Sequence, residues 1–270
     1  KYFTSTTLDY SLEMKFLVTG SSGLIGSQIV KDLLSKGHQV YSCYNKSKPA
    51  GGKPVHMDLT DSKDIENSLH EIKPDVIIHL AAMTNVDECE TNEKIATKVN
   101  VDATKLLLIH ATKFNSFFIY VSTDYIFDGI IGMYNESDTP KPLGIYGKTK
   151  LDGEKEVQKS QCNWCIARTS TPFGFHPIKK TFPIWVIDNL KNNKKINIFT
   201  DQFTSPTYIP NLSKMLIEIS EKKIPGIIHV SGASRISRFN FSQKITEKLN
   251  LDSSTLINPI SLDQTESKNH

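Results

Sequence analysis

Apolar runs alternate along the first part of the chain with longer amphipathic stretches. Runs rich in Val, Ile, Leu and Phe predict strands at 15–20, 38–44, 75–82, 117–123 and 165–170. Helical spacing of apolar residues predicts helices between these strands, at 24–36, 61–72, 93–114 and 146–160. The strand runs are continuously apolar, which is typical of a parallel sheet buried on both faces. Residues 14–170 are therefore predicted to form an α/β domain with a doubly wound parallel sheet.

The alternation loosens after residue 171. Helical patterns recur at 182–192, 209–220 and 239–250, and strand-like runs at 195–199 and 226–232. We expect residues 171–270 to form mainly a smaller substrate-binding lobe. The strands near 195–200 and 226–232 are candidates to return to the main sheet.

Composition narrows the class of protein. The 270 residues are 38% hydrophobic, enough for an ordinary core, and the net charge of +3 comes with no dense basic run. Apolar stretches such as Val76–Met83 are too short to span a bilayer. Residues 1–13 lack the apolar segment of a signal peptide and are expected to be a disordered extension. These features favour a cytoplasmic protein without nucleic-acid or membrane partners.

Cys162 and Cys165 have the spacing of a redox motif, but they lie in the run "CNWCIARTS", which reads as a strand. Residues three apart on a strand face opposite sides, which suits neither a disulfide nor a shared metal. No second Cys/His pair completes a zinc site, so we expect these thiols to be structural and no metal to be bound.

A glycine-rich stretch, "TGSSGLIGS" (19–27), follows the first strand and opens the first helix. Gly20 and Gly23 permit a tight turn and close approach to a phosphate, and Gly26 permits close packing of helix on strand. The helix N-terminus offers free N–H groups to a pyrophosphate. The alternative is a merely structural turn. The expected cofactor contacts are Gly20, Ser22, Gly23, Leu24 and Ile25.

The second strand ends in "YNKSK" (44–48), where Rossmann domains reach the adenosine ribose. An acidic residue there favours NAD, but no Asp or Glu occurs between Lys36 and Met57. Asn45 and Lys46, with further polar residues beside them, instead suit a 2′-phosphate. We therefore expect NADP(H) as the preferred cofactor, with NAD(H) possible. The alternative is a solvated loop.

A similar pentapeptide, "YGKTK" (146–150), opens a predicted helix. Residues i and i+4 share a helical face, so the Lys150 ammonium is expected to lie near the Tyr146 phenol and lower its pKa. The strand that ends at Thr123 directs a hydroxyl to the same crevice. Thr123, Tyr146 and Lys150 are the predicted catalytic residues. Ser122 competes with Thr123 for the hydroxyl role, because neighbouring strand residues face opposite sides.

Together, the glycine spacing and the Thr-Tyr-Lys set resemble the short-chain dehydrogenase/reductase superfamily. Asp58 and Leu59 resemble its adenine-flanking pair, and Asn100 falls where its extended branch carries a helix asparagine. Asp58 can equally be the N-cap of helix 61–72. The stretch "HLAA" (79–82) resembles the segment under the cofactor, which implies contacts from Leu80, Ala81 and Ala82.

Three stretches are similar to the dTDP-4-dehydrorhamnose reductase family: "AAMTNVDECE" (81–90), "VSTDYIFDG" (121–129) and "DQFTSPTYIPNLS" (201–213). This resemblance implies NADPH-dependent reduction of the 4-keto group of a nucleotide-linked 6-deoxy sugar, as in dTDP-rhamnose biosynthesis. It also implies sugar contacts from Thr84, Val86, Thr123, Tyr125 and Tyr146, with Gln202, Phe203 and Thr204 near the nucleotide. Asp124 and Asp128 in this motif are alternatively turn-capping residues.

Two departures from the family pattern bear on the substrate. Thr171 stands where relatives have a tryptophan near the sugar, and relatives usually continue beyond His270. The resemblance also leaves two alternative functions open. One is a nucleotide-sugar epimerase or dehydratase, and the other is a non-catalytic regulatory subunit similar to that of methionine adenosyltransferase. Superfamily members often pair helices such as 93–114 and 146–160, which implies a possible homodimer.

Overall fold

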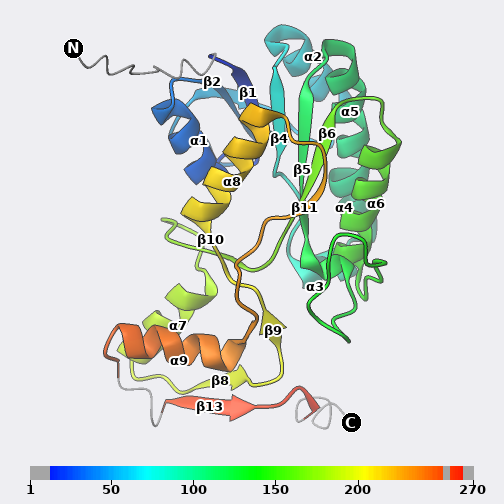
Figure 1. Cartoon of the computed structure of the whole chain (residues 1–270). Helices are drawn as coiled ribbons and strands as arrows, with labels where there is room; N and C mark the ends of the chain where they lie inside the picture. The colour runs from blue at the N-terminus through cyan, green and yellow to red at the C-terminus, as the bar shows by residue number, and fades with distance from the viewer. Residues whose placement is uncertain (1–12, 252–255, 264–270) are drawn as a thin grey trace, which may run out of the picture.

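A parallel β-sheet forms the centre of the protein (Figure 1). The computed structural model describes residues 13–251 and 256–263. Within these ranges the sheet has seven strands in the order β11-β6-β5-β4-β1-β2-β3. The strands are β1 (Lys15–Thr19), β2 (Gln39–Tyr44), β3 (Lys53–His56), β4 (Val76–His79), β5 (Phe117–Thr123), β6 (Trp164–Thr169) and β11 (Gly226–His229). The predicted doubly wound α/β fold is confirmed.

Helices cover both faces of this sheet, as Figure 1 shows. One face carries α1 (Gly26–Ser35) and α8 (Ile209–Lys222), and the other carries α2 (Ser62–Ile72), α5 (Ala103–Phe114) and α6 (Ile145–Lys159). Strand β5 is buried at every position, because alternate residues enter opposite cores: Ile119 packs on the α1/α8 side and Phe118 on the α2/α5 side. Two-sided burial explains the continuously apolar strand sequence.

The predicted helix over 93–114 is divided into three parts. Short helix α4 (Glu93–Thr97) leads into a π-helical turn, η1 (Lys98–Asp102), which continues as α5. A further short helix, α3 (Val86–Thr91), precedes them and was not predicted. The π turn contains Asn100, which is almost fully buried. Single π turns within helices often mark functional sites.

The smaller lobe lies below the carboxyl edge of the sheet in Figure 1. It contains α7 (Phe182–Lys191), α9 (Arg238–Lys248) and the parallel pair β8 (Ile196–Phe199) and β13 (Ile257–Ile260). Two further short pairs are β7 (Pro172–Phe173) with β10 (Thr207–Tyr208), and β9 (Phe203–Thr204) with β12 (Ile236–Ser237). A 3₁₀ turn, η2 (Asp124–Ile126), follows β5.

Only one of the two candidate returning strands joins the main sheet. Strand β11 pairs with β6, whereas β8 pairs with β13 instead. Ile196 and Ile198 of β8 pack against Val186 and Leu190 of α7, so the apolar face of β8 is buried within the lobe. The boundary near residue 171 is therefore crossed by the chain, because α8 and β11 return to the first domain.

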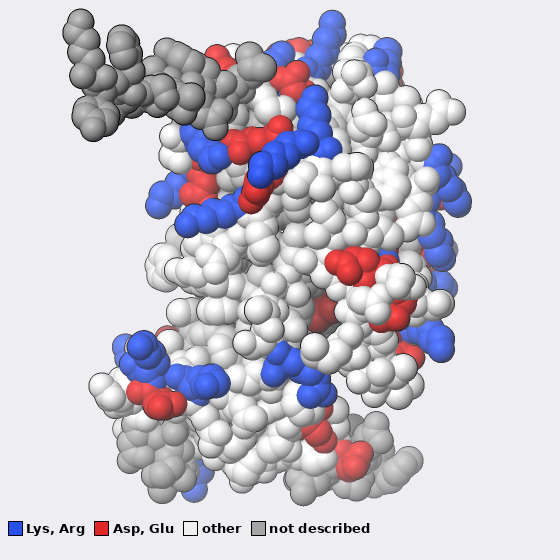
Figure 2. Space-filling model, viewed as in Figure 1, with Lys and Arg blue, Asp and Glu red and all other residues white. Residues whose placement is uncertain are grey.

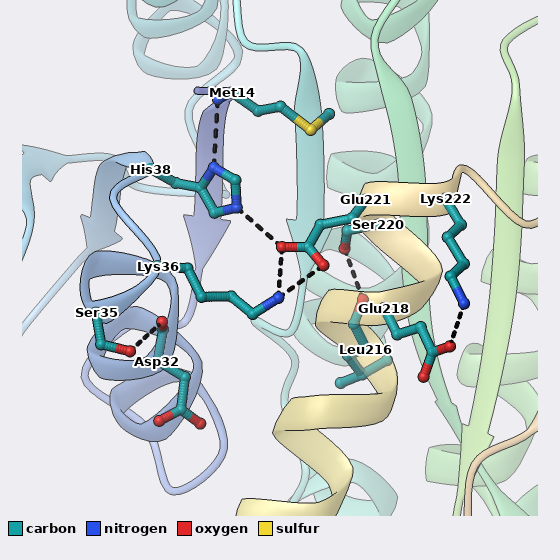
Figure 3. A network of polar contacts seen from close by, with 10 residues as sticks. All are labelled: Met14, Asp32, Ser35, Lys36, His38, Leu216, Glu218, Ser220, Glu221 and Lys222. Carbon is teal, nitrogen blue, oxygen red and sulfur yellow. Dashed lines mark hydrogen bonds and ion pairs between the residues drawn. The ribbon is translucent and has the colours of Figure 1, made fainter. Parts of the chain in front are cut away.

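A polar network fastens α8 to the first domain (Figure 3). Glu221 on α8 accepts two hydrogen bonds from the Lys36 ammonium, at 2.7 and 2.8 Å, and its Oε1 lies 3.1 Å from Nε2 of buried His38. Nδ1 of the same ring accepts the Met14 N–H at 3.3 Å. The His38 ring thus links the Met14 backbone, just before β1, to Glu221 on α8.

The charge distribution on the surface and the ends of the chain give no further indication of function. Figure 2 shows basic and acidic side chains interleaved on the face that it presents. In the described residues, no helix is long and apolar enough to cross a membrane. The predicted extension over 1–13 lies outside the described residues except at its last position.

Candidate active site

A cleft of about 780 Å³ opens at the carboxyl ends of β1, β4, β5 and β6. In open α/β sheets this edge is where ligands bind. All of the predicted site residues line the cleft except Gln202, Phe203 and Thr204. The structure therefore brings the glycine loop, the "HLAA" segment and the Tyr146 helix to one wall.

The glycine loop has the geometry of a tight phosphate-binding turn. Gly20 has a φ of +66°, and a Cβ there would lie 2.9 Å from the backbone nitrogen of Ala81. A side chain at Gly26 would collide with the carbonyl oxygen of Gly20. In the described part of the chain, no acceptor pairs with the N–H groups of Leu24 or Ile25. These free donors precede α1 and belong to residues that line the cleft, so they suit an anion.

Buried hydrogen bonds fix the floor of the cleft beneath Leu80 and Ala81. The N–H groups of both residues donate to Oγ1 of Thr19 at 3.1 Å, and this oxygen lies 2.7 Å from Nδ1 of His79. Nε2 of His79 lies 3.1 Å from the Thr104 hydroxyl. Burial, and secondarily the charge of Lys150, lowers the pKa of His79 to about 3, so the ring stays neutral.

Asp58 and Lys46 mark the far end of the cleft. The Asp58 carboxylate accepts the N–H and the hydroxyl of Thr60, both at 2.8 Å, and these bonds lower its pKa. The N-cap of α2 is Asp61, which accepts the Lys63 N–H at 2.8 Å. The N-cap alternative for Asp58 is therefore wrong. Lys46 lines the cleft, and Lys48 does not.

Asn100 joins the cleft floor to the helix of the predicted tyrosine. Its Oδ1 accepts the Met83 N–H at 2.8 Å, and its Nδ2 donates to the Met83 carbonyl at 3.1 Å and to Oγ1 of Thr149 at 3.0 Å. Thr149 precedes Lys150 on α6, so the π turn fixes this helix against the segment after β4. Lys150 is buried, with its ammonium 3.9 Å from the centre of the Tyr120 ring.

The pKa of Tyr146 departs from the expected direction. Burial raises it to about 12, the neighbouring Thr123 hydroxyl lowers it, and Asp124 raises it further. The prediction of a pKa below the ordinary value is wrong, because desolvation of the phenolate outweighs the hydrogen bond with Thr123. Tyr146 is therefore a protonated acid near neutral pH.

Burial shifts the pKa of Lys150 in the opposite direction from that of Tyr146. Burial lowers its pKa to about 7, against the opposing charge of Glu154 one turn along the helix. Near neutral pH the amine is thus divided between its charged and neutral forms. It can therefore take up or release a proton beside the tyrosine.

Ser122 and Thr123, at the end of β5, both border the cleft. Thr123 is the one that interacts with the Tyr146 phenol. Oγ of Ser122 is buried, and no partner for it lies among the described residues. Asp124 also lines the cleft and accepts the Ser170 hydroxyl at 2.5 Å, whereas Asp128 accepts the Ile130 N–H within a turn. The turn-capping alternative therefore holds for Asp128 alone.

Gln202, Phe203 and Thr204 lie behind the wall of the cleft. Thr204 contacts the hydroxyls of Ser170 and Thr171, and the Gln202 carbonyl accepts the Arg238 N–H at 2.9 Å. Thr171 lines the cleft with a φ of +39°, which is unusual for a β-branched residue. The segment over 202–204 thus supports wall residues, and its predicted contact with substrate remains a prediction.

Sequence reasoning missed several wall residues, among them His176, Lys179 and Arg238. Nδ1 of His176 accepts the N–H groups of Ile178 and Lys179, while its Nε2 lies 3.3 Å from the Ser22 carbonyl. These residues reach the cleft from the second lobe. No local pattern in the sequence indicates such a contact.

Comparison with known proteins identifies the family. The family model described as "RmlD substrate binding domain" matches residues 14–269, nearly the whole chain. The chain belongs to this family. Membership agrees with the order of the cleft motifs, from the glycine loop to the "YGKTK" helix.

Relatives in the family carry different names. The chain is 34% identical over 255 residues to a probable low-salt glycan biosynthesis reductase, Agl14, of Haloferax volcanii, covering 93% of this chain and 85% of that protein. It is 31% identical over 250 residues to methionine adenosyltransferase 2 subunit beta of Pongo abelii, covering 90% and 74%.

A solved structure shares the fold throughout. The crystal structure of a dTDP-4-dehydrorhamnose reductase from Bacillus anthracis, in complex with NADP, matches with a TM-score of 0.85 and 28% identity. The match covers 94% of this chain and 86% of that chain. With this coverage the likeness extends across both lobes.

Proposed function

We propose that the protein is an NADPH-dependent reductase of the 4-keto group of a nucleotide-linked 6-deoxy sugar. The observation that carries the proposal is the meeting of Thr123, Tyr146 and Lys150 in the same cleft as the glycine loop. A hydroxyl, a protonated phenol and an amine beside a dinucleotide-type turn suit carbonyl reduction. The reductase names of several relatives support the same activity.

The residues of the cleft fit a nicotinamide dinucleotide. The free N–H groups of Leu24 and Ile25 would hold its pyrophosphate, and Asp58 and Leu59 would flank the adenine. Asn45 and Lys46, with no acidic residue nearby on β2, favour a 2′-phosphate and hence NADP(H) over NAD(H). When bound, the reduced cofactor supplies the hydride.

Side chains of the protein would then supply the proton and stabilise the negative charge that develops on the carbonyl oxygen. Tyr146, kept protonated by burial, donates its proton to the carbonyl oxygen as negative charge develops there. The Thr123 hydroxyl orients that oxygen by a hydrogen bond. Lys150, with a pKa of about 7, can reprotonate the phenolate after turnover.

The residues proposed to contact the substrate are chosen by their place in the cleft. Thr84, Val86 and Tyr125 line it on the α3 side, and the Tyr125 ring packs edge-on against Tyr146 with centroids 5.5 Å apart. These residues are proposed to contact the sugar. Thr171, a small residue on the opposite wall, leaves more room than a tryptophan and is proposed to alter the choice of sugar. A homodimer through the helices over 93–114 and 146–160 remains a proposal.

A turnover assay with dTDP-, UDP- and GDP-linked 4-keto-6-deoxy sugars tests the function. A reductase oxidises NADPH in step with the keto sugar, while an epimerase gives no net oxidation. The similarity to methionine adenosyltransferase 2 subunit beta favours a second candidate, a regulatory subunit. That candidate predicts cofactor binding without turnover of any sugar in the panel.

A further inference from the structure

Arg238 is a cationic residue of the cleft with no role in the chemistry described above. It is the first residue of α9, directly after the N-cap Ser237, and its side chain lines the cleft. Its backbone N–H donates to the Gln202 carbonyl at 2.9 Å, which fixes the start of the helix. The residue therefore projects from the second lobe toward the catalytic wall.

The guanidinium is supported on one face and free at its edge. Its central carbon lies 4.9 Å from the centre of the Phe182 ring, which positions the planar group by stacking. Throughout residues 13–251 and 256–263, no side chain or carbonyl accepts a hydrogen bond from it. The side chain is half-buried, so its unpaired N–H donors have lost part of their hydration.

Asp124, an acidic residue that lines the same cleft, does not accept a hydrogen bond from these donors. Asp124 interacts with Arg238 electrostatically, but the two form no ion pair within contact distance. The Asp124 carboxylate instead accepts the hydroxyls of Ser170 and Thr123. The Asp124 carboxylate thus has partners of its own, and among the described residues the Arg238 guanidinium, which belongs to a residue lining the cleft, has no hydrogen-bond acceptor.

We propose that Arg238 binds a phosphate group of the substrate and anchors the nucleotide-linked sugar beside Tyr146. A planar, stacked guanidinium presents paired N–H donors that match the oxygens of a phosphate. The N-terminus of α9 adds a partial positive charge at the same place. This inference rests on the proposed function, since it assigns one residue to its substrate.

Arg238 lies in a different part of the cleft from the residues proposed to bind the cofactor. Lys46 and the free N–H groups of the glycine loop lie at the β1–β2 end. Arg238 lies on the other side, with Asp124 and Tyr125 as its electrostatic neighbours. A phosphate at Arg238 therefore belongs to the second ligand, the one that carries the reacting carbonyl.

Calorimetric titration with dTDP, UDP and GDP, in saturating NADP⁺, tests the proposal directly. Saturating cofactor prevents the nucleotides from occupying the glycine loop. The variants are Arg238→Gln, which removes the charge, and Arg238→Lys, which keeps the charge but loses the fork and the stacking. Arg235→Gln is the matched control, because Arg235 is stacked on Phe203, outside the cleft.

The tightest of the three nucleotides should bind Arg238→Gln on the order of tenfold to a hundredfold more weakly than the wild type. The nucleotide affinity of Arg238→Lys should lie between those of Arg238→Gln and the wild type. The affinity of Arg235→Gln should match that of the wild type. Equal affinity in Arg238→Gln and the wild type would overturn the proposal. So would an equal loss in both arginine-to-glutamine variants, or failure of the wild type to bind any of the three.

The same experiment separates this proposal from the proposed activity. Arg238-dependent binding of a nucleoside diphosphate, without oxidation of NADPH by any keto sugar, would reject the reductase and keep the anion site. Oxidation of NADPH with nucleotide affinity independent of Arg238 would keep the reductase and reject the site.

Discussion

Arg168 on β6 donates two hydrogen bonds to Glu154 on α6, from Nε to Oε1 at 3.1 Å and from Nη2 to Oε2 at 2.8 Å. Both side chains are almost completely buried. Glu154 lies one turn after Lys150, and its charge raises the pKa of that lysine against the effect of burial. The ion pair thus fixes α6 to the sheet and raises the pKa of the Lys150 amine, one turn after Tyr146 on the same helix.

Replacing Glu154 with Gln should destabilise the fold by about 3–5 kcal/mol, because Arg168 would remain buried without its counter-charge. The pKa of Lys150 should fall further, since the charge that raises it is gone. Urea unfolding measures the first effect. Glu218→Gln is a control: Glu218 forms an exposed ion pair with Lys222, whose loss should change stability by less than about 1 kcal/mol. Equal losses in the two variants would contradict this account.

The Glu221 network in Figure 3 should make stability depend on pH. Lys36 and His38 hold the pKa of Glu221 below its ordinary value of 4.5, despite partial burial. Its stabilisation is therefore fully present above pH 4.5 and is lost as pH falls through the lower folded-state pKa. Glu221→Gln should cost about 1 kcal/mol at pH 7. The difference from the wild type should shrink under acid conditions, and a constant difference down to pH 3 would argue against the network.

Cofactor selection should depend on one of the two lysines in "YNKSK". Lys46 lines the cleft and Lys48 does not, so Lys46→Glu should weaken NADPH binding by about tenfold to a hundredfold. NADH binding should change much less, because it lacks the 2′-phosphate. Fluorescence titration of both cofactors checks this, with Lys48→Glu as the matched control. A loss of NADPH affinity in Lys48→Glu alone would refute the assignment.

Tyr146→Phe should reduce turnover by about 10²–10⁴-fold, since it removes the proton donor while leaving the ring in place. NADPH affinity should persist in this variant, because the free N–H groups of the glycine loop are untouched. Measuring turnover and cofactor affinity on one preparation separates loss of chemistry from loss of folding. Undiminished turnover would show that another group supplies the proton.

The glycine loop, the buried strands and the Thr-Tyr-Lys set could be predicted because each depends on local pattern. Gly20 needs a positive φ, β5 needs apolar residues on both faces, and Tyr146 and Lys150 share a helical face through their spacing. These requirements are visible within a few neighbouring positions. The residues predicted to bind the cofactor therefore line one cleft, while their role remains a prediction.

Other features depend on contacts between distant segments. Arg238 reaches the cleft because β9 pairs with β12 and places the start of α9 beside the wall. Strand β8 remains in the small lobe because it pairs with β13, whose partner residues lie 61 positions later, as in Ile196 with Ile257. The pKa of Tyr146 depends on total burial, which spacing along a helix does not reveal. None of these could be derived from a short window of sequence.

The most direct measurement of the central claim is NADPH oxidation, followed by absorbance, with a dTDP-linked 4-keto-6-deoxy sugar and product analysis of the sugar. The account predicts one NADPH consumed for each keto group reduced by the wild type, and almost none by Tyr146→Phe. Cofactor binding without NADPH oxidation across the dTDP-, UDP- and GDP-linked keto sugars would contradict it.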